Sequence, residues 1–107
     1  MTAISENIVS QFKLQLQKLY GERLAKVILF GSYARGEEKE TSDIDFLVVL
    51  KDKRISTFSE IEKMNSLTYE IMLKYGKVIS FVPTTEEKFN SSPNYFYRRV
   101  KQEGKTV

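Results

Sequence analysis

The sequence of 107 residues contains neither cysteine nor histidine. Without cysteine, the protein has no disulfides, no zinc–thiolate site and no thiol nucleophile. Without histidine, no imidazole can act as a general base or bind a metal ion, so acid–base and metal chemistry fall to Asp and Glu. The two absences therefore direct the search for a functional site to the carboxylates.

Long apolar stretches are missing as well. No segment approaches the roughly 18 apolar residues that a membrane-spanning helix needs. The N-terminal sequence also lacks the basic-then-apolar order of a secretory signal. We therefore expect a cytoplasmic protein without a membrane partner. The length predicts one domain, residues 1–107, with room for a single core.

Positive charge is modest overall, with a net charge of +3, and it gathers near the C-terminus. Arg98, Arg99, Lys101 and Lys105 are accompanied there by a single acid, Glu103. This pattern favours a solvated helix face over a phosphate-binding patch. No RNP or KH motif is present, so RNA binding is the weakest of the functions considered and a nucleic-acid partner is not expected.

Three short runs rich in β-branched residues predict strands over residues 25–30, 43–50 and 77–82. Gly31 bounds the first run, and Pro83 is expected to end the third. A helix precedes the first strand, a short and a long helix separate the three strands, and further helices follow. This order predicts an α/β protein of the two-layer α+β type, with a small mixed sheet.

Capping residues mark the expected limits of the first helices. Ser5 is the predicted N-cap of the first helix, which ends at Gly21, and Gly76 ends the long helix. Apolar residues at helical spacing predict the buried face of the long helix. These residues are Phe58, Ile61, Met64, Leu67, Ile71 and Tyr75.

Two further helices are predicted after the third strand. Thr84 and Glu87 are expected to form a capping box for a short helix. Ser92 is expected to cap the last helix, with Pro93 at its first position and Gly104 past its end.

Two aspartates at the start of the second strand need an explanation. Asp43 and Asp45 lie one residue apart, so their side chains point to the same face, with backbones roughly 6.6 Å apart. At about 7 Å, two ionised carboxylates repel by roughly 2 kcal/mol at an effective dielectric constant near 20. A divalent cation would offset this repulsion, and oxygen ligands favour Mg²⁺ or Mn²⁺ over zinc or copper. The alternative is that Asp43 caps a loop and Asp45 faces solvent on an edge strand.

A Gly-Ser pair follows the first strand. Gly31 allows the backbone to bend there or to approach another group closely. The amides of Ser32, Tyr33 and Ala34 would open a short helix and could seat a phosphate, with the Ser32 hydroxyl as an additional donor. A phosphate seat beside paired carboxylates describes a site for a metal-bound nucleoside triphosphate.

Arg35 comes directly after this turn and has two interpretations. Its guanidinium could reach a phosphate, or it could pair with Glu37 or Glu38 on the surface. The sequence does not favour either interpretation.

The segment FGSYARGEEKETSDIDF, residues 30–46, resembles the signature of the DNA polymerase beta-type nucleotidyltransferase superfamily. That signature consists of a hydrophobic residue, Gly-Ser, a spacer and then Asp-hydrophobic-Asp-hydrophobic. The matching residues are Phe30, Gly31, Ser32, Asp43, Ile44, Asp45 and Phe46. The extended GSYARG…SDID form is similar to the minimal nucleotidyltransferases, small single domains often paired with a HEPN-domain partner.

The resemblance implies a nucleotidyltransferase-like fold. It also implies a Mg²⁺-dependent enzyme that transfers a nucleoside monophosphate, AMP from ATP, to a hydroxyl, with a protein acceptor and an antitoxin role. Asp43 and Asp45 would be the catalytic and metal-binding residues, and Gly31, Ser32 and Arg35 would bind the nucleotide phosphates. The chain is too short for a separate acceptor domain. We therefore expect a HEPN-domain protein, or a second copy in a homo-oligomer, to present the acceptor.

One residue departs from the family pattern. Active members have a third carboxylate on a neighbouring strand, and Ser80 occupies the matching place here, with no acid between Lys77 and Pro83. Two carboxylates can still hold one Mg²⁺ with a triphosphate, whereas a second metal ion would lose a ligand. The alternative function is therefore a catalytically weakened antitoxin module that binds a nucleotide or a partner.

Overall fold

Helices and strands alternate along the computed structural model, which describes residues 1–107. In chain order the elements are α1 (Ala3–Tyr20), the 3₁₀ turn η1 (Gly21–Arg23), β1 (Leu24–Phe30), α2 (Ser32–Arg35), β2 (Ile44–Leu50), α3 (Thr57–Tyr75), β3 (Ile79–Thr85), α4 (Glu86–Ser91), α5 (Tyr95–Glu103) and β4 (Lys105–Thr106). None of the helices is both long enough and apolar enough to cross a membrane.

The four strands form one mixed sheet in the order β3-β2-β1-β4. β1 pairs antiparallel with β2 and with β4, whereas β2 pairs parallel with β3. The mixed sheet confirms the predicted fold class. β4 was not predicted, because a two-residue strand carries no periodic pattern. Its pairing to β1 depends on α5 returning the chain to the sheet.

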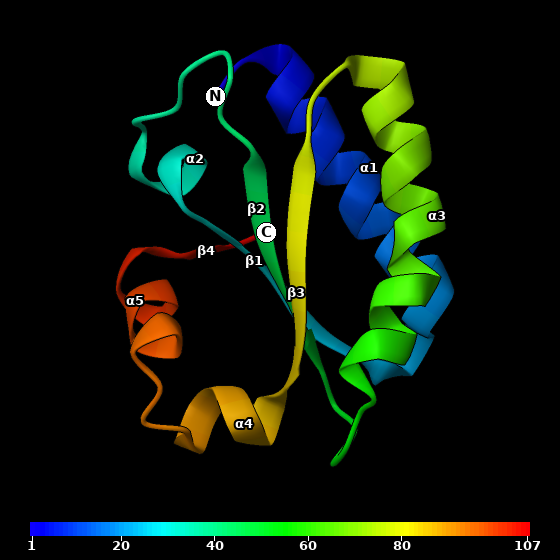
Figure 1. Ribbon diagram of the computed structural model, residues 1–107, viewed down its shortest axis with the longest axis vertical. Helices are drawn as coiled ribbons and strands as arrows, with labels where there is room; N and C mark the ends of the chain where they lie inside the picture. Colours follow the sequence, from blue (N-terminus) through cyan, green and yellow to red (C-terminus); the bar gives the residue numbers. More distant parts are fainter.

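One face of the sheet is covered by α1 and α3, which lie together on one side of the molecule (Figure 1). Ile44, Phe46 and Val48 of β2 point to this face and are fully buried. The Phe12 and Phe46 rings pack with their centroids 4.5 Å apart. Because burying one such side chain is worth about 1.5–3 kcal/mol, this layer supplies most of the apolar stabilisation.

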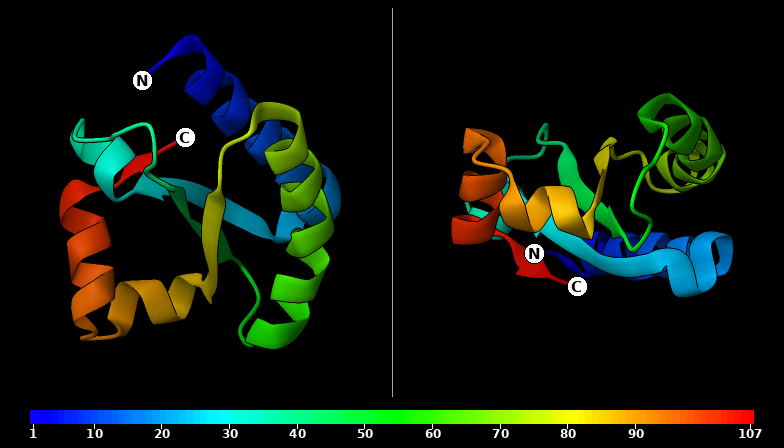
Figure 2. Two further views of the ribbon diagram at one scale, coloured as in Figure 1. Left: turned by 45° about the horizontal axis from the view of Figure 1, so that its top comes forward. Right: turned by 90° about the horizontal axis from the view of Figure 1, so that it is seen from below.

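The opposite face is covered in part by α4 and α5. Leu47 and Val49 of β2 point to this face and pack with Phe89 of α4 and Val100 of α5. Figure 2 shows, from two other directions, that these two helices lie apart from α1 and α3. Their smaller layer leaves the starts of β2 and β3 free of helical cover, which is where the acidic pair lies.

Two predicted N-caps were wrong. Thr2, not Ser5, caps α1, since its hydroxyl accepts the Ser5 N–H at 3.1 Å, and Ser5 lies buried in the first turn. Asn94, not Ser92, caps α5, and Pro93 precedes the helix. Polar clusters offer several capping oxygens, and the direction in which the chain enters the helix selects one of them.

The third strand extends beyond its predicted end. Pro83 pairs with Val48 inside β3, and the strand continues to Thr85. β3 lies at the edge of the sheet, where a proline is tolerated if its missing N–H faces away from the only neighbouring strand. Thr84 therefore belongs to the strand and hydrogen-bonds the Tyr97 hydroxyl at 2.8 Å, and Thr85 caps α4 in its place.

The buried face of α3 differs from the prediction at its first turn. Phe58 is 74% exposed, whereas Glu60 is only 4% exposed. The Tyr20 hydroxyl and the Arg23 guanidinium donate hydrogen bonds to the Glu60 carboxylate at 2.9 and 3.2 Å. A buried charge is stable when it is paired in this way. The predicted helix ends at Gly21 and Gly76 are confirmed.

Candidate active site

Asp43 and Asp45 lie at the N-terminal end of β2. Asp43 is exposed and directly precedes β2, and Asp45 is partly exposed within it. Since Ile44 and Phe46 point into the core with α1 and α3, the Asp45 side chain points to the opposite face. β2 is a central strand, so the alternative of an acid on an edge strand is excluded.

Strand pairing brings Ser80 to the same place. Ser80 pairs with Asp45 across the parallel β2–β3 ladder. Its hydroxyl donates a hydrogen bond to Asp43 Oδ2 at 3.2 Å. Ser80 therefore contacts one aspartate and lies beside the other, and no group of three acidic side chains forms here.

Gly31 meets Asp45 from the other neighbouring strand. Phe30 pairs with Asp45 at the end of β1, and Gly31 follows with φ +75°. A Cβ atom built on Gly31 would overlap Asp45 Oδ2 and would lie 3.1 Å from Asp45 Cγ. Both the positive φ and this close approach require glycine.

The turn after Gly31 differs in detail from the predicted phosphate seat. The N–H groups of Ala34 and Arg35 donate to the Gly31 carbonyl at 3.1 Å, so the Ala34 amide is already used within the turn. Tyr33 and Ala34 are buried, whereas Ser32 is partly exposed. Ser32 is therefore the member of this turn that a ligand can reach.

Arg35 pairs with carboxylates. Its guanidinium bonds to Glu37 at 2.7 Å and to Glu103 at 3.1 Å. The surface alternative is therefore the one observed, with Glu103 as a partner that the sequence did not indicate. Glu38 instead lies 3.7 Å from the N-terminal amine of Met1.

Glu103 ties the C-terminal helix to this region. It accepts hydrogen bonds from Arg35 and, at 3.3 Å, from Arg99 of its own helix. Partial burial works against ionisation of Glu103, but the two guanidinium groups together lower its pKa. A cavity of about 310 Å³ lies beside this cluster and is lined in part by Gly31, Arg35 and Tyr95.

The acidic pair has no cationic partner in the fold. Neither Asp43 nor Asp45 forms a salt bridge, although salt bridges occupy other acids nearby. Burial and then the charge of Asp43 raise the pKa of Asp45, and the more distant charge of Arg35 opposes the shift. Two oxygen-only ligands without a protein cation fit a hard divalent ion that takes its other ligands from water or phosphate.

A sequence profile described as the nucleotidyltransferase domain matches residues 9–106. The chain belongs to this family. It is therefore a nucleotidyltransferase, an enzyme of the transferase class.

The nucleotidyltransferase is similar to several known proteins. It is 38% identical over 103 residues to a Methanocaldococcus jannaschii protein provisionally named protein adenylyltransferase MJ0604, covering 95% of this chain and 96% of that protein. It is 34% identical over 74 residues to protein adenylyltransferase MntA of Thermococcus cleftensis, covering 64% of this chain and 73% of that protein. A crystal structure of a toxin–antitoxin with AMP-PNP has a similar fold, with a TM-score of 0.62 and 22% identity over 89% of this chain and 68% of that chain.

Proposed function

We propose that this nucleotidyltransferase transfers AMP from ATP to a hydroxyl group of a partner protein, with Asp43 and Asp45 holding Mg²⁺ or Mn²⁺. The observation that carries the proposal is the acidic pair, which has no protein cation and is pressed against Gly31 at the end of β1. The names of the two relatives, both protein adenylyltransferases, support AMP and a protein acceptor. The toxin–antitoxin neighbour with AMP-PNP supports an antitoxin role beside a partner protein, for which the sequence resemblance implies a HEPN domain.

In the proposed reaction, the acceptor oxygen forms a bond to the α-phosphorus of ATP. The bond from that phosphorus to the bridging oxygen of the β-phosphate breaks, pyrophosphate leaves, and the acceptor hydroxyl loses its proton. A divalent ion bound by the carboxylates would neutralise phosphate charge and position the triphosphate. The chain itself supplies the two carboxylates, the narrow turn at Gly31 and the Ser32 hydroxyl.

The presence of Ser80 in place of a third carboxylate supports the alternative function, a catalytically weakened binding module. A serine hydroxyl donates to Asp43 and orients it, but it is not charged and does not attract a second cation as a carboxylate would. Loss of a charged base or ligand commonly lowers turnover by about 10²–10⁴-fold. The second candidate is therefore a module that binds ATP and a partner but transfers AMP slowly or not at all.

Radiolabelled ATP distinguishes the two candidates. The protein is mixed with ATP carrying the label in the α-phosphate, with Mg²⁺ and with the product of the adjacent reading frame. Label on the partner, absent with Asp45→Asn and retained with the exposed Glu70→Gln control, is expected for the enzyme. Binding of ATP without any label on either protein would support the weakened module and overturn AMP transfer.

A further inference from the structure

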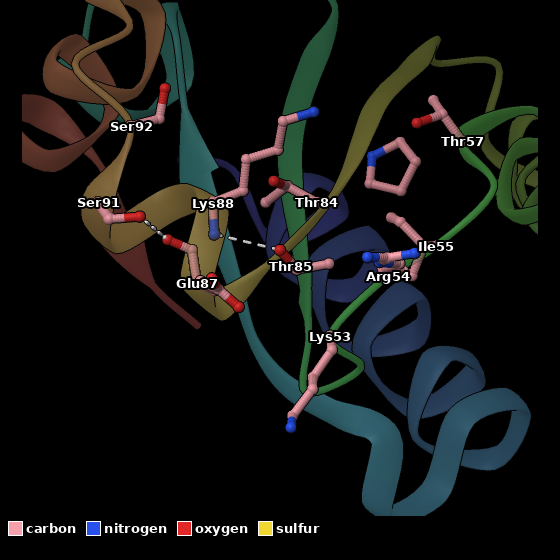
Figure 3. Close-up of a pocket in the computed structure, with 11 residues that line it drawn as sticks. Lys53, Arg54, Ile55, Thr57, Thr84, Thr85, Glu87, Lys88, Ser91 and Ser92 are labelled. Carbon is pink, nitrogen blue, oxygen red and sulfur yellow. Dashed lines mark hydrogen bonds between the residues drawn. The ribbon is translucent and has the colours of Figure 1, made fainter.

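A second cavity lies at the far end of β2 and β3, and the proposed reaction does not use it. Its volume is about 650 Å³, and it lies between the loop before α3, the end of β3 and α4 (Figure 3). Asp45 and Ser80 pair near one end of the β2–β3 ladder, and Leu50 and Thr85 pair at the other end. Five residues of strand place this cavity roughly 16 Å from the acidic pair.

The charge around this cavity is positive. Lys53, Arg54 and Lys88 line it, together with one carboxylate, Glu87. The three cations are exposed, and none of them takes part in any of the salt bridges of the fold. In Figure 3 the Lys88 side chain extends past Thr84, and the Glu87 carboxylate points the other way. The fold therefore leaves these three cations without an ion-pair partner.

Hydroxyl groups make up most of the remaining lining. They belong to Thr57, Thr84, Thr85, Ser91 and Ser92. The Thr85 hydroxyl accepts the Lys88 N–H at 3.1 Å, and the Ser92 hydroxyl accepts the Asn94 N–H at 3.3 Å. Both hydroxyls accept in these bonds, so their own protons remain available to a ligand oxygen.

The lining identifies the class of ligand. Lysine, arginine and hydroxyl donors together are the groups that proteins use for phosphate oxygens. Apolar side chains are nearly absent, so a hydrophobic ligand has little surface to bury. The volume lies within the range of about 300–1,000 Å³ that small-molecule sites occupy. Because the donors line one hollow, a compact phosphorylated molecule fits it better than an extended acidic chain.

We propose that this cavity is a second anion site, which binds the phosphate groups of a small phosphorylated molecule independently of the acidic pair and of any metal ion. Lys88 and Arg54 supply the charge, and the hydroxyls of Thr85 and Ser92 supply directed hydrogen bonds. The site lies outside the region that the nucleotidyltransferase reaction needs, so its occupancy does not depend on catalysis.

Calorimetry with inorganic pyrophosphate, in EDTA and at low salt, tests the proposal. The double variant R54Q/K88Q removes two charges and no hydrogen bond or salt bridge made by either side chain. K13Q/K74Q is the control, with the same change in net charge. We expect binding to weaken at least about tenfold in the first variant and to stay within about twofold in the control, since charge-assisted hydrogen bonds are lost only in the first.

Amide chemical shifts of the wild-type protein give a second measurement that needs no variant. In EDTA, where the acidic pair holds no metal ion, pyrophosphate and AMP are expected to shift the amides of Thr85 and Lys88 and to leave those of Gly31 and Ser32 in place. Equal weakening in both double variants, or shifts confined to Gly31 and Ser32, would overturn the site. Tighter binding of a hexaglutamate peptide or a short RNA through the same residues would overturn the assignment to small phosphorylated molecules.

Discussion

Replacing Gly31 by alanine tests the close contact on which the proposed metal site depends. The added methyl group meets two separate obstacles. An alanine at φ +75° and ψ −156° occupies a region that is essentially restricted to glycine, which costs about 1–3 kcal/mol. The methyl group also overlaps the Asp45 carboxylate, which must rotate away or displace its strand, and overpacking of this kind costs about 1–3 kcal/mol. We therefore expect Gly31→Ala to lower the free energy of unfolding by roughly 2–6 kcal/mol.

Gly21→Ala is the matched control. Gly21 has φ +55° and ψ −125°, near the backbone conformation of Gly31, and nothing lies within 4 Å of a Cβ built on it. This variant should lose only the backbone contribution of about 1–3 kcal/mol. The difference between the two variants isolates the contact with Asp45. Urea unfolding of the metal-free proteins measures both free energies.

Removing the carboxylate completes the test. In an Asp45→Ala background the overlapping Oδ2 and Cγ atoms are gone, so Gly31→Ala should cost no more than Gly21→Ala. In the wild-type background, Gly31→Ala should also abolish Mg²⁺-dependent ATP binding, while Gly21→Ala retains it. Equal losses of stability for the two glycine variants in the wild-type background would refute the argument that Gly31 is kept for its contact with Asp45.

Further changes test the charges around the site. Ser80→Asp should destabilise the metal-free protein by on the order of 1–2 kcal/mol, and added Mg²⁺ should restore that stability. The same substitution should raise AMP transfer; unchanged transfer would show that the missing carboxylate is not limiting. The pKa of Asp45 is higher in the folded protein than its unfolded value near 3.8. Protonation of Asp45 therefore stabilises the fold fully when the pH is below the unfolded pKa, and this stabilisation is lost as the pH rises through the folded pKa. Without metal, Asp45→Asn should therefore be more stable than wild type at neutral pH, with the gain shrinking towards pH 3; a pH-independent difference in urea titrations would contradict this. Glu103→Gln should remove one of the two carboxylates that hold Arg35, leaving Glu37, and so tighten ATP binding in calorimetry; weaker binding would mean that Glu103 positions Arg35 for the ligand. Mg²⁺ and ATP should each tighten the binding of the other, and Asp43→Asn should remove this coupling.

Local patterns in the chain were sufficient for the parts of the fold that depend on neighbouring residues. Glycine at Gly21 and Gly76 ended helices as predicted, because a residue at positive φ stops a helix whatever surrounds it. The alternation of Asp43, Ile44 and Asp45 placed Ile44 in the core for a similar reason, since successive side chains of a strand point to opposite faces.

Other features depended on partners distant in the chain. Glu60 is buried in the first turn of α3, where Phe58 was expected to be buried, because Tyr20 at the end of α1 and Arg23 of η1 reach it. Pro83 can lie inside β3 because β3 is an edge strand, and only the order of the strands in the folded sheet makes it one. Neither feature leaves a periodic pattern in its own segment.

The candidate site likewise combines features that the local sequence predicted with features that only tertiary contacts determine. The Gly-Ser pair and the two aspartates of one short segment indicated a nucleotidyltransferase, since 15 consecutive residues, 31–45, carry all four of them. Tertiary structure decided that Ser80 hydrogen-bonds Asp43 and that Arg35 is held by Glu103, 68 residues further along the chain. It also gathered Lys53, Arg54 and Lys88 around one cavity. Contacts of this kind arise only when separate elements pack together, so no local sequence pattern carries them.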